Sequence, residues 1–160
     1  MATSNSMPEI GKTAPDFSLQ DQNGDEVTLS DLKGKNVIVY FYPKAMTPGC
    51  TVQACGLRDA KTELASKNVV SIGISPDPFS RLKKFEEKHE LNFTLVSDED
   101  HTIAEKYGVW GLKKFMGREF MGILRTTFII DASGNLVHVM DKFKTKTHDQ
   151  DVLAWVNDNL

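Results

Sequence analysis

Continuous apolar runs along the middle of the chain predict buried strands. Residues 36–42 read NVIVYFY and residues 69–75 read VVSIGIS, and a shorter run covers residues 93–96. Runs rich in β-branched and aromatic residues are typical of strands that are covered on both faces. Pro43 ends the first run, because proline cannot continue a strand inside a sheet. We therefore expect three core strands.

Amphipathic patterns between and after these runs predict helices. Thr47 can serve as an N-cap and Pro48 as the first helical residue, where the missing N–H of proline costs nothing. This helix should reach about Lys67. The other helices are expected at 79–89, 97–107 and 148–159.

Turn signals near both ends of the chain predict two hairpins. Strand-like runs at 17–19 and 26–29 flank Gln22-Asn23-Gly24, and Asn-Gly is a strong hairpin signal. Runs at 126–130 and 136–140 flank the polar segment 131–135. Residues 108–122 hold four glycines and are expected to form a loop.

The order of these elements predicts an α/β fold. A hairpin is followed by alternating strands and helices, then by a second hairpin and a final helix. Crossovers give parallel pairing and hairpins antiparallel pairing, so the three-layer domain should hold a central mixed sheet. This fits a thioredoxin-like fold with an N-terminal β-hairpin, although periodicity alone also permits a flavodoxin-like one. We expect a single domain at 8–160 and a disordered tail at 1–7.

Composition excludes several classes of function. The 160 residues carry 22 acidic and 19 basic side chains, a net charge of −3, so we expect no nucleic-acid partner. No apolar stretch is long enough to span a membrane, and we expect no membrane partner. Residues 1–7 lack the basic and apolar regions of a secretory signal, which predicts a cytoplasmic protein, although a mature organellar protein without its transit peptide would look the same. Two cysteines and four scattered histidines predict no metal site.

Cys50 is the strongest candidate for a reactive residue. It would be the third residue of the helix that begins after Thr47, where free N–H groups and the positive end of the helix dipole stabilise an anion. Its strand–loop–helix context places it at the carboxyl end of a central strand, where open α/β sheets hold their sites. A buried cysteine can also be merely a small apolar side chain, but this cap favours a nucleophilic thiolate.

Cys55 lies five residues further along the same predicted helix. The axial rise between them is about 7.5 Å and the side chains point about 140° apart. Disulfide-bonded Cα atoms usually lie about 4.4–6.8 Å apart. A bond between Cys50 and Cys55 therefore requires the first turns of the helix to unwind; otherwise Cys55 is a structural thiol.

Arg125, which precedes the run at 126–130, can be either a surface charge or a cation that holds a thiolate and a polar substrate. The motif Pro43-x-x-x-Thr47-x-x-Cys50, with Arg125 in Arg-Thr-Thr-Phe, resembles the active-site signature of the peroxiredoxins. The run FYPKAMTPGCTVQACGLR at 41–58 is similar to the bacterioferritin comigratory protein, or peroxiredoxin Q, branch. The resemblance extends from about residue 8 to the C-terminus.

The resemblance implies a role for each of these residues. Cys50 matches the peroxidatic cysteine and Cys55 the resolving cysteine, which forms an intramolecular disulfide. Thr47 matches the hydroxyl that contacts the peroxide, Pro43 the residue that shields the pocket, and Arg125 the family's arginine. The implied activity is reduction of hydrogen peroxide and alkyl hydroperoxides, with thioredoxin or glutaredoxin as reductant. No haem, metal, flavin or other cofactor is implied, and an in-chain resolving cysteine suits a monomer.

Two other functions remain as alternatives. A thiol–disulfide oxidoreductase shares the fold, but it favours Cys-x-x-Cys, whereas the spacing here is Cys-x4-Cys. A metal-binding module of the same fold could hold a soft ion with two cysteines and a histidine. Insulin reduction without peroxide consumption would favour the first, and metal uptake by the reduced protein the second.

Overall fold

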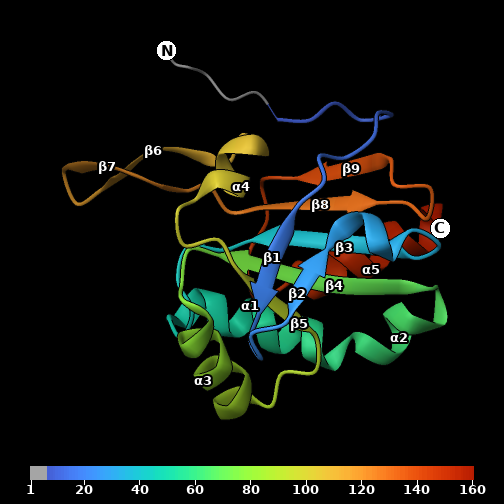
Figure 1. The fold of residues 1–160 in the computed structure, drawn as a ribbon, viewed down its shortest axis with the longest axis horizontal. Helices are drawn as coiled ribbons and strands as arrows, with labels where there is room; N and C mark the ends of the chain where they lie inside the picture. The colour runs from blue at the N-terminus through green and yellow to red at the C-terminus, as the bar shows by residue number, and fades with distance from the viewer. Residues whose placement is uncertain (1–6) are drawn as a thin grey trace.

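A seven-stranded mixed sheet forms the centre of the molecule, described here from a computed structural model covering residues 7–160. The tail predicted at 1–7 lies outside the described residues except for Met7. The strands lie in the order β2-β1-β5-β4-β3-β8-β9, and β3, β4 and β5 are mutually parallel (Figure 1). Their bounds are Ser18–Asp21 (β1), Glu26–Thr28 (β2), Asn36–Phe41 (β3), Val69–Ser75 (β4), Thr94–Ser97 (β5), Thr126–Ile130 (β8) and Leu136–Met140 (β9). This mixed sheet confirms the predicted fold class.

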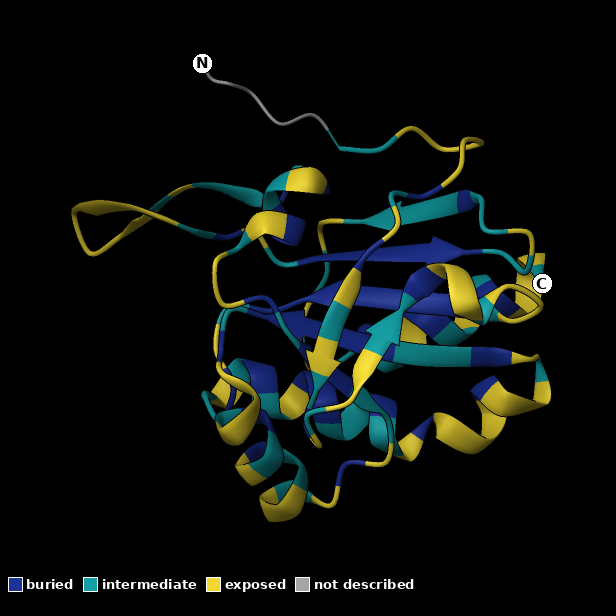
Figure 2. Ribbon diagram, in the orientation of Figure 1, coloured by how far each residue is buried: buried dark blue, intermediate teal, exposed yellow. Residues whose placement is uncertain are grey.

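Helices cover both faces of the sheet and make three layers. Their bounds are Pro48–Asp59 (α1), Lys61–Ser66 (α2), Phe79–His89 (α3), Thr102–Lys106 (α4) and His148–Asn159 (α5), with a 3-10 helix at Leu29–Leu32. Along β3, Val37, Val39 and Phe41 pack into the cluster beneath α4. Ile38 and Tyr40 point the other way, into the cluster beneath α1, α2, α3 and α5. Alternation along a strand thus supplies both cores, and the central strands are the most buried (Figure 2).

Two predicted helices differ from the observed ones. The first is broken at Ala60 into α1 and α2. The helix expected from Ser97 begins only at Thr102, because Asp98 turns its carboxylate to accept the N–H groups of Ile103 and Ala104 at 3.1 and 2.9 Å. The side-chain oxygen of Asp98 therefore satisfies the start of α4 from outside the helix.

The prediction of a loop at 108–122 is wrong. These residues form an antiparallel hairpin, with β6 at Trp110–Phe115 and β7 at Arg118–Ile123, that projects from the body of the molecule (Figure 1). Met116 and Gly117 make its turn with φ of 52° and 79°. The glycines that suggested a loop include the turn residue Gly117 and the cross-strand pair Gly111 and Gly122.

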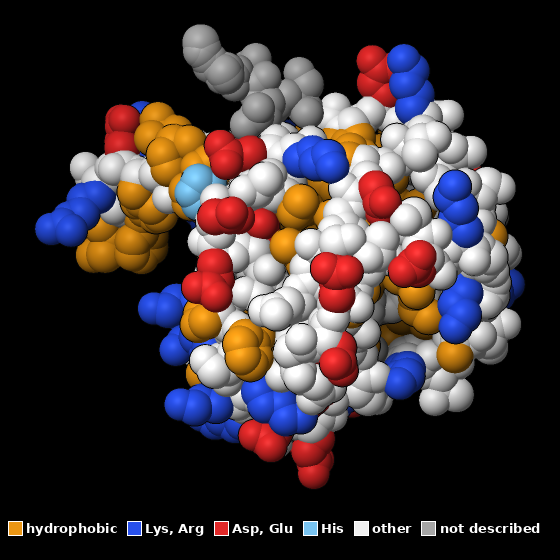
Figure 3. Space-filling model, viewed as in Figure 1, with side chains coloured by type: hydrophobic (Ala, Val, Ile, Leu, Met, Phe, Trp, Pro, Cys, Tyr) orange, Lys and Arg blue, Asp and Glu red, His pale blue; other side chains and the backbone are white. Residues whose placement is uncertain are grey.

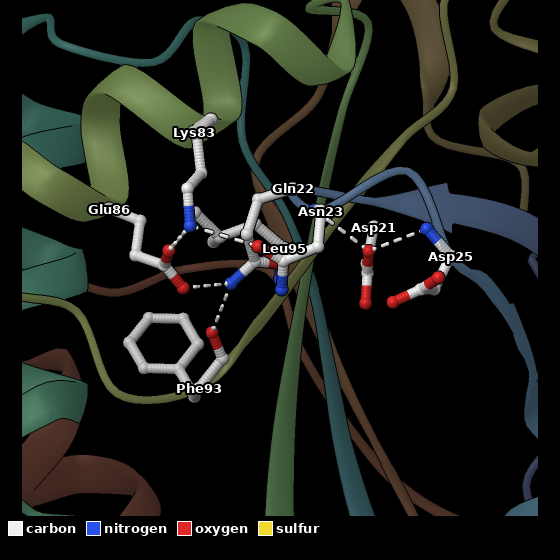
Figure 4. A network of polar contacts seen from close by, with 8 residues as sticks. All are labelled: Asp21, Gln22, Asn23, Asp25, Lys83, Glu86, Phe93 and Leu95. Atoms are coloured by element: carbon white, nitrogen blue, oxygen red, sulfur yellow. Dashed lines mark hydrogen bonds and ion pairs between the residues drawn. The ribbon is translucent and has the colours of Figure 1, made fainter.

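The predicted N-terminal hairpin is present, and its turn is fixed to the body by polar contacts centred on the buried Gln22 (Figure 4). The Gln22 amide nitrogen donates to Glu86 of α3 at 2.5 Å and to the Phe93 carbonyl at 3.1 Å. Its amide oxygen accepts the Leu95 N–H at 3.0 Å. The side chain of Lys83 bridges Asn23 and Glu86 at 2.9 Å each. Gln22 therefore connects the hairpin to both α3 and β5.

Gly56 allows α1 to lie close against α5. A Cβ atom at this position would lie 2.9 Å from the Cγ atom of Asp149, which is closer than real Cβ atoms approach. The second half of α1 is thus held against α5, whereas its first turn faces the end of the sheet described next.

Candidate active site around Cys50

Cys50 lies in the first turn of α1, just beyond the carboxyl end of β3. Thr47 precedes the helix with extended backbone angles and Pro48 is its first residue, as predicted. The first helical hydrogen bond runs from the Thr51 N–H to the Thr47 carbonyl at 2.9 Å, so the N–H groups of Gly49 and Cys50 precede the helical ladder. The side chain of Cys50 is 1% exposed. This position suits a negatively charged sulfur.

The hydroxyl of Thr47 does not cap the helix. It donates to the Lys44 carbonyl at 2.7 Å, within a loop where Met46 has a φ of 67°. Since the hydroxyl proton is used, the lone pairs of the oxygen remain to accept a hydrogen bond. Pro43 is half-buried at the start of this loop.

The pairing of β3 with β8 brings Arg125 to Cys50. The strands are antiparallel and Thr126 lies opposite Phe41, so Arg125 falls at the edge of the sheet where β3 gives way to the loop before α1. One terminal nitrogen of Arg125 donates to the Cys50 sulfur at 3.4 Å. The structure therefore joins two residues that the sequence alone could not place together.

Gln53 holds the other branch of the same guanidinium. Its side-chain oxygen accepts a hydrogen bond from Arg125 at 2.7 Å, and the residue is fully buried. The sequence analysis missed Gln53. Its spacing of three residues from Cys50 was the available signal, because such residues share one face of a helix.

Asp77 and Arg81 brace the loop before Cys50, and the sequence analysis missed both. One carboxylate oxygen of Asp77 accepts the Ala45 N–H at 2.7 Å and the Ser75 hydroxyl at 2.8 Å. Arg81 pairs with the other oxygen at 3.2 Å and donates to the Ala45 carbonyl at 3.0 Å. The end of β4 and the start of α3 thus fix the backbone at Ala45.

Cys55 is half-buried on the same continuous helix, and both cysteines are free thiols. Cys55 lies five positions after Cys50 in this intact helix, so the pair is not in disulfide geometry. The resolving role of Cys55 stays a prediction, as do the roles assigned to Pro43, Thr47 and Arg125.

Positive charge and burial shape the surroundings of Arg125. Burial, with a contribution from Arg125, lowers the pKa of His148 to about 4, and its ring nitrogen lies 2.8 Å from the Thr127 hydroxyl. Burial and the charge of Arg125 also lower the pKa of Lys113, whose ammonium is in turn favoured by Cys50. Lys113 belongs to β6, so the projecting hairpin begins beside this site.

Neither a metal site nor a membrane span is found in the part of the chain that the structure describes. No group of three or more histidine, cysteine or acidic side chains in residues 7–160 converges as ligands would. None of the helices in these residues has the length and apolar character needed to cross a bilayer.

Comparisons with known proteins show which family the chain resembles in sequence. Residues 10–139 match the model of the AhpC/TSA family. The chain is 56% identical to peroxiredoxin Bcp of Escherichia coli over 151 residues, which cover 94% of this chain and 97% of the relative.

Solved structures of similar proteins share the fold of this chain. Peroxidoxin BcpB of Mycobacterium tuberculosis superposes with a TM-score of 0.84 at 36% identity, covering 97% of this chain and 99% of that one. Bacterioferritin comigratory protein of Xanthomonas campestris, described for its alkyl peroxide reduction activity, gives a TM-score of 0.84 at 30% identity, covering 89% of this chain and 90% of that one.

Proposed function

Because the chain belongs to the AhpC/TSA family of peroxiredoxins, we propose that Cys50 is the cysteine that attacks the peroxide. The chain is a thiol-dependent peroxidase. The observation that carries the assignment to Cys50 is its hydrogen bond from Arg125 at 3.4 Å, made in the first turn of α1. Cys55 has neither this donor nor a place at the helix start.

The first chemical step breaks the O–O bond of the peroxide. The Cys50 thiolate attacks one oxygen, a sulfur–oxygen bond forms, and the second oxygen leaves with its electron pair as water or an alcohol after taking a proton. Cys50 becomes a sulfenic acid, the reversible state of cysteine oxidation. Negative charge moves from sulfur onto oxygen during this step, so fixed donors that face both atoms lower the barrier.

Arg125, Thr47 and Pro43 serve this step in different ways. The guanidinium of Arg125 stabilises the thiolate and then the departing oxygen. Thr47, whose hydroxyl proton is directed to Lys44 at 2.7 Å, accepts a hydrogen bond from the O–H of the peroxide. Pro43 closes the side of the pocket against water without presenting an N–H that would compete for the substrate.

Cys55 resolves the sulfenic acid. Its thiol attacks the Cys50 sulfur, a disulfide forms and water leaves, after the first turns of α1 have unwound. A dithiol protein, thioredoxin or glutaredoxin, then reduces the disulfide through a mixed intermediate. Hydrogen peroxide and alkyl hydroperoxides are the substrates, and the enzyme acts as a cytoplasmic monomer. The alkyl peroxide reduction ascribed to the Xanthomonas campestris relative supports the organic substrates.

Intact mass of the reduced protein after one equivalent of hydrogen peroxide, with free thiols then blocked, tests the mechanism. We expect the loss of two hydrogens, no blocked cysteine and a monomeric mass. Cys50→Ser should consume no peroxide, whereas Cys55→Ser should gain one oxygen and stop.

Other results of this experiment would contradict parts of the proposal. One added oxygen on the unaltered protein, with Cys55 still free to be blocked, would retain Cys50 as the attacking residue and remove Cys55 as the resolver. Peroxide consumption that persists in Cys50→Ser would overturn the assignment of the attacking cysteine.

A further inference from the structure

The projecting hairpin carries five of the nine large apolar side chains that are exposed in residues 7–160, and the site does not use them. Within residues 7–160, β6 and β7 pair with each other and not with the seven-stranded sheet. Only the base of the hairpin is fixed, by the burial of Ile123 and by the stacking of Trp110 on the His101 ring at 3.8 Å. An isolated two-stranded hairpin is marginally stable in water, so a free one of this length calls for an explanation.

Both faces of the hairpin carry exposed apolar side chains. Cross-strand partners lie on one face of a hairpin, and the register pairs Leu112 with Met121. The opposite face carries Phe115 and Phe120. Phe115 is 67% exposed, and Met116 at the turn is 86% exposed. Apolar side chains therefore lie on both faces of the hairpin instead of lining one side of it, and Figure 3 shows those on the side that faces the viewer.

The charge of the hairpin is opposite to that of the whole chain. It holds Lys113, Lys114 and Arg118 against the single acid Glu119, whereas the chain carries a net charge of −3. Lys114 and Arg118 are exposed near the turn, and Lys114 lies 3.7 Å from Glu119. Basic side chains beside an apolar tip are complementary to a layer that is anionic outside and apolar beneath.

We propose that the outer part of the β6–β7 hairpin docks on the surface of an anionic lipid bilayer. Phe115 and Met116 enter the interface, while Lys114 and Arg118 contact the headgroups. A bilayer can surround both faces of the hairpin at once, as the distribution of apolar side chains requires. Insertion stops at the interface, because the unpaired edges of a two-stranded sheet cannot enter hydrocarbon.

The expectation of no membrane partner rested on the lack of a spanning segment, which peripheral docking does not require. Docking at the tip would leave the Cys50 site outside the lipid, at the side of the hairpin where Lys113 lies close enough to Arg125 and Cys50 for both to affect its pKa. The proposal goes beyond the peroxidase activity and does not depend on the roles given to the two cysteines.

A second copy of the chain fits the hairpin less well. A symmetric dimer joins the same patch of both subunits, so two hairpins that each carry three cations and one acid would meet with the same sign of net charge. Such like-charge contacts oppose association, whereas an anionic surface favours it.

Cosedimentation with vesicles tests the proposal. We expect the reduced protein to bind vesicles that contain both phosphatidylcholine and phosphatidylglycerol. Its binding to vesicles of phosphatidylcholine alone, and its binding to the mixed vesicles at high salt, should each be at least tenfold weaker. The double variant Phe115→Ser, Met116→Ser and the charge variant Lys114→Glu, Arg118→Glu should each lose at least tenfold in binding. Ile10→Ser, which changes an apolar residue that is 60% exposed outside the hairpin, is the matched control and should bind normally.

Further measurements distinguish docking on lipid from self-association and from binding of the reductant. Hydrogen peroxide turnover in free solution should be the same in the tip variant and the original protein, which also shows that the variant is folded. Failure of the original protein to bind anionic vesicles overturns the proposal, whatever the turnover. A dimer by analytical ultracentrifugation that the tip variant abolishes, without vesicle binding, would assign the hairpin to self-association. Slower recycling by the dithiol protein in the tip variant, again without vesicle binding, would assign it to the reductant.

Discussion

Arg125 donates a hydrogen bond to the Cys50 sulfur at 3.4 Å although 75 positions separate the two residues. The same guanidinium donates to Gln53 at 2.7 Å, so its two branches reach successive turns of one helix. A planar fork can make both contacts at once, and a lysine ammonium cannot reproduce that geometry.

Replacing Arg125 should slow the attack on peroxide. Removal of one fixed donor from a site of developing negative charge typically costs about 10²–10³ in rate. We expect Arg125→Met to lose about two orders of magnitude in the second-order rate constant for hydrogen peroxide, measured by stopped flow. Arg125→Lys should recover only part of this loss, and a full recovery would show that charge alone suffices.

Gln53 should act through Arg125 and not on the peroxide directly. Gln53→Leu removes the acceptor and frees one branch of the guanidinium, so we expect about a tenfold lower rate constant, less than the roughly 10²–10³ that complete removal of a donor costs. In the Arg125→Met background, the same change should have little further effect. If the losses of the two single variants add in the double variant, Gln53 has a role that does not depend on Arg125. Gln20→Leu, on the exposed part of β1, makes the same exchange away from the site and serves as control.

Oxidation should shorten α1. Residues five apart in a helix rise by about 7.5 Å, which exceeds the Cα separation that a disulfide usually spans. We expect peroxide treatment to reduce the helical circular dichroism signal at 222 nm and dithiothreitol to restore it. Cys55→Ser should keep its signal under the same peroxide. A proven bond between the two cysteines with unchanged helicity would contradict the unwinding.

His148 should make the protein less stable in mild acid. Burial, with a contribution from Arg125, lowers its pKa to about 4 in the folded state, whereas an unfolded histidine titrates near 6.5. The folded protein resists protonation of His148, so neutral His148 favours the folded state. This contribution to the free energy of unfolding is present above pH 6.5 and is lost as pH falls toward 4. Between pH 7 and pH 5 the loss should be roughly 2 kcal/mol.

Urea unfolding at the two pH values measures this contribution. His148→Gln keeps an amide nitrogen able to reach Thr127 but does not titrate, so its stability should fall less over the same interval. Equal losses in both proteins would show that His148 does not cause the acid sensitivity.

Gln22 should contribute to stability without affecting catalysis. Gln22→Leu leaves the Leu95 N–H and the Phe93 carbonyl without their side-chain partner, and an unsatisfied buried group costs about 1–3 kcal/mol. Thermal unfolding should show a lower midpoint, while the rate constant for peroxide stays unchanged. Gln20→Leu again provides the matched exchange, since that residue is exposed and should change the midpoint little.

The sequence predicted the features that depend on neighbouring residues. The apolar run of β3, the Thr47–Pro48 start of α1 and the position of Cys50 follow from patterns within about 15 residues, and the structure confirms them. The place of Arg125 depends on the register that sets Thr126 opposite Phe41. Local pattern contains no information on such a register, so only the family resemblance indicated a role for Arg125.

The sequence did not predict the roles of Asp77 and Arg81 or the hairpin at 110–123, and the physical reasons differ. Asp77 and Arg81 act on the Ala45 backbone from another strand and helix, so nothing beside Cys50 in the sequence indicates them. The hairpin at 110–123 departs from the usual alternation of apolar and polar positions, because it exposes apolar side chains on both faces. Because no alternating pattern indicated strands there, the four glycines of residues 108–122 were the strongest signal, and they predicted a loop.

The close contact between Gly56 and α5 has a consequence for the speed of the catalytic cycle. In the proposed cycle the first turns of α1 unwind, and we expect the residues beyond Cys55, which lie against Asp149, to stay helical as a template. Starting a helix is the unfavourable step of helix formation, and extending one takes on the order of nanoseconds per residue. We therefore expect α1 to regrow from this template after each reduction, and the Cys50 site to be restored far faster than the oxidised enzyme meets a dithiol protein.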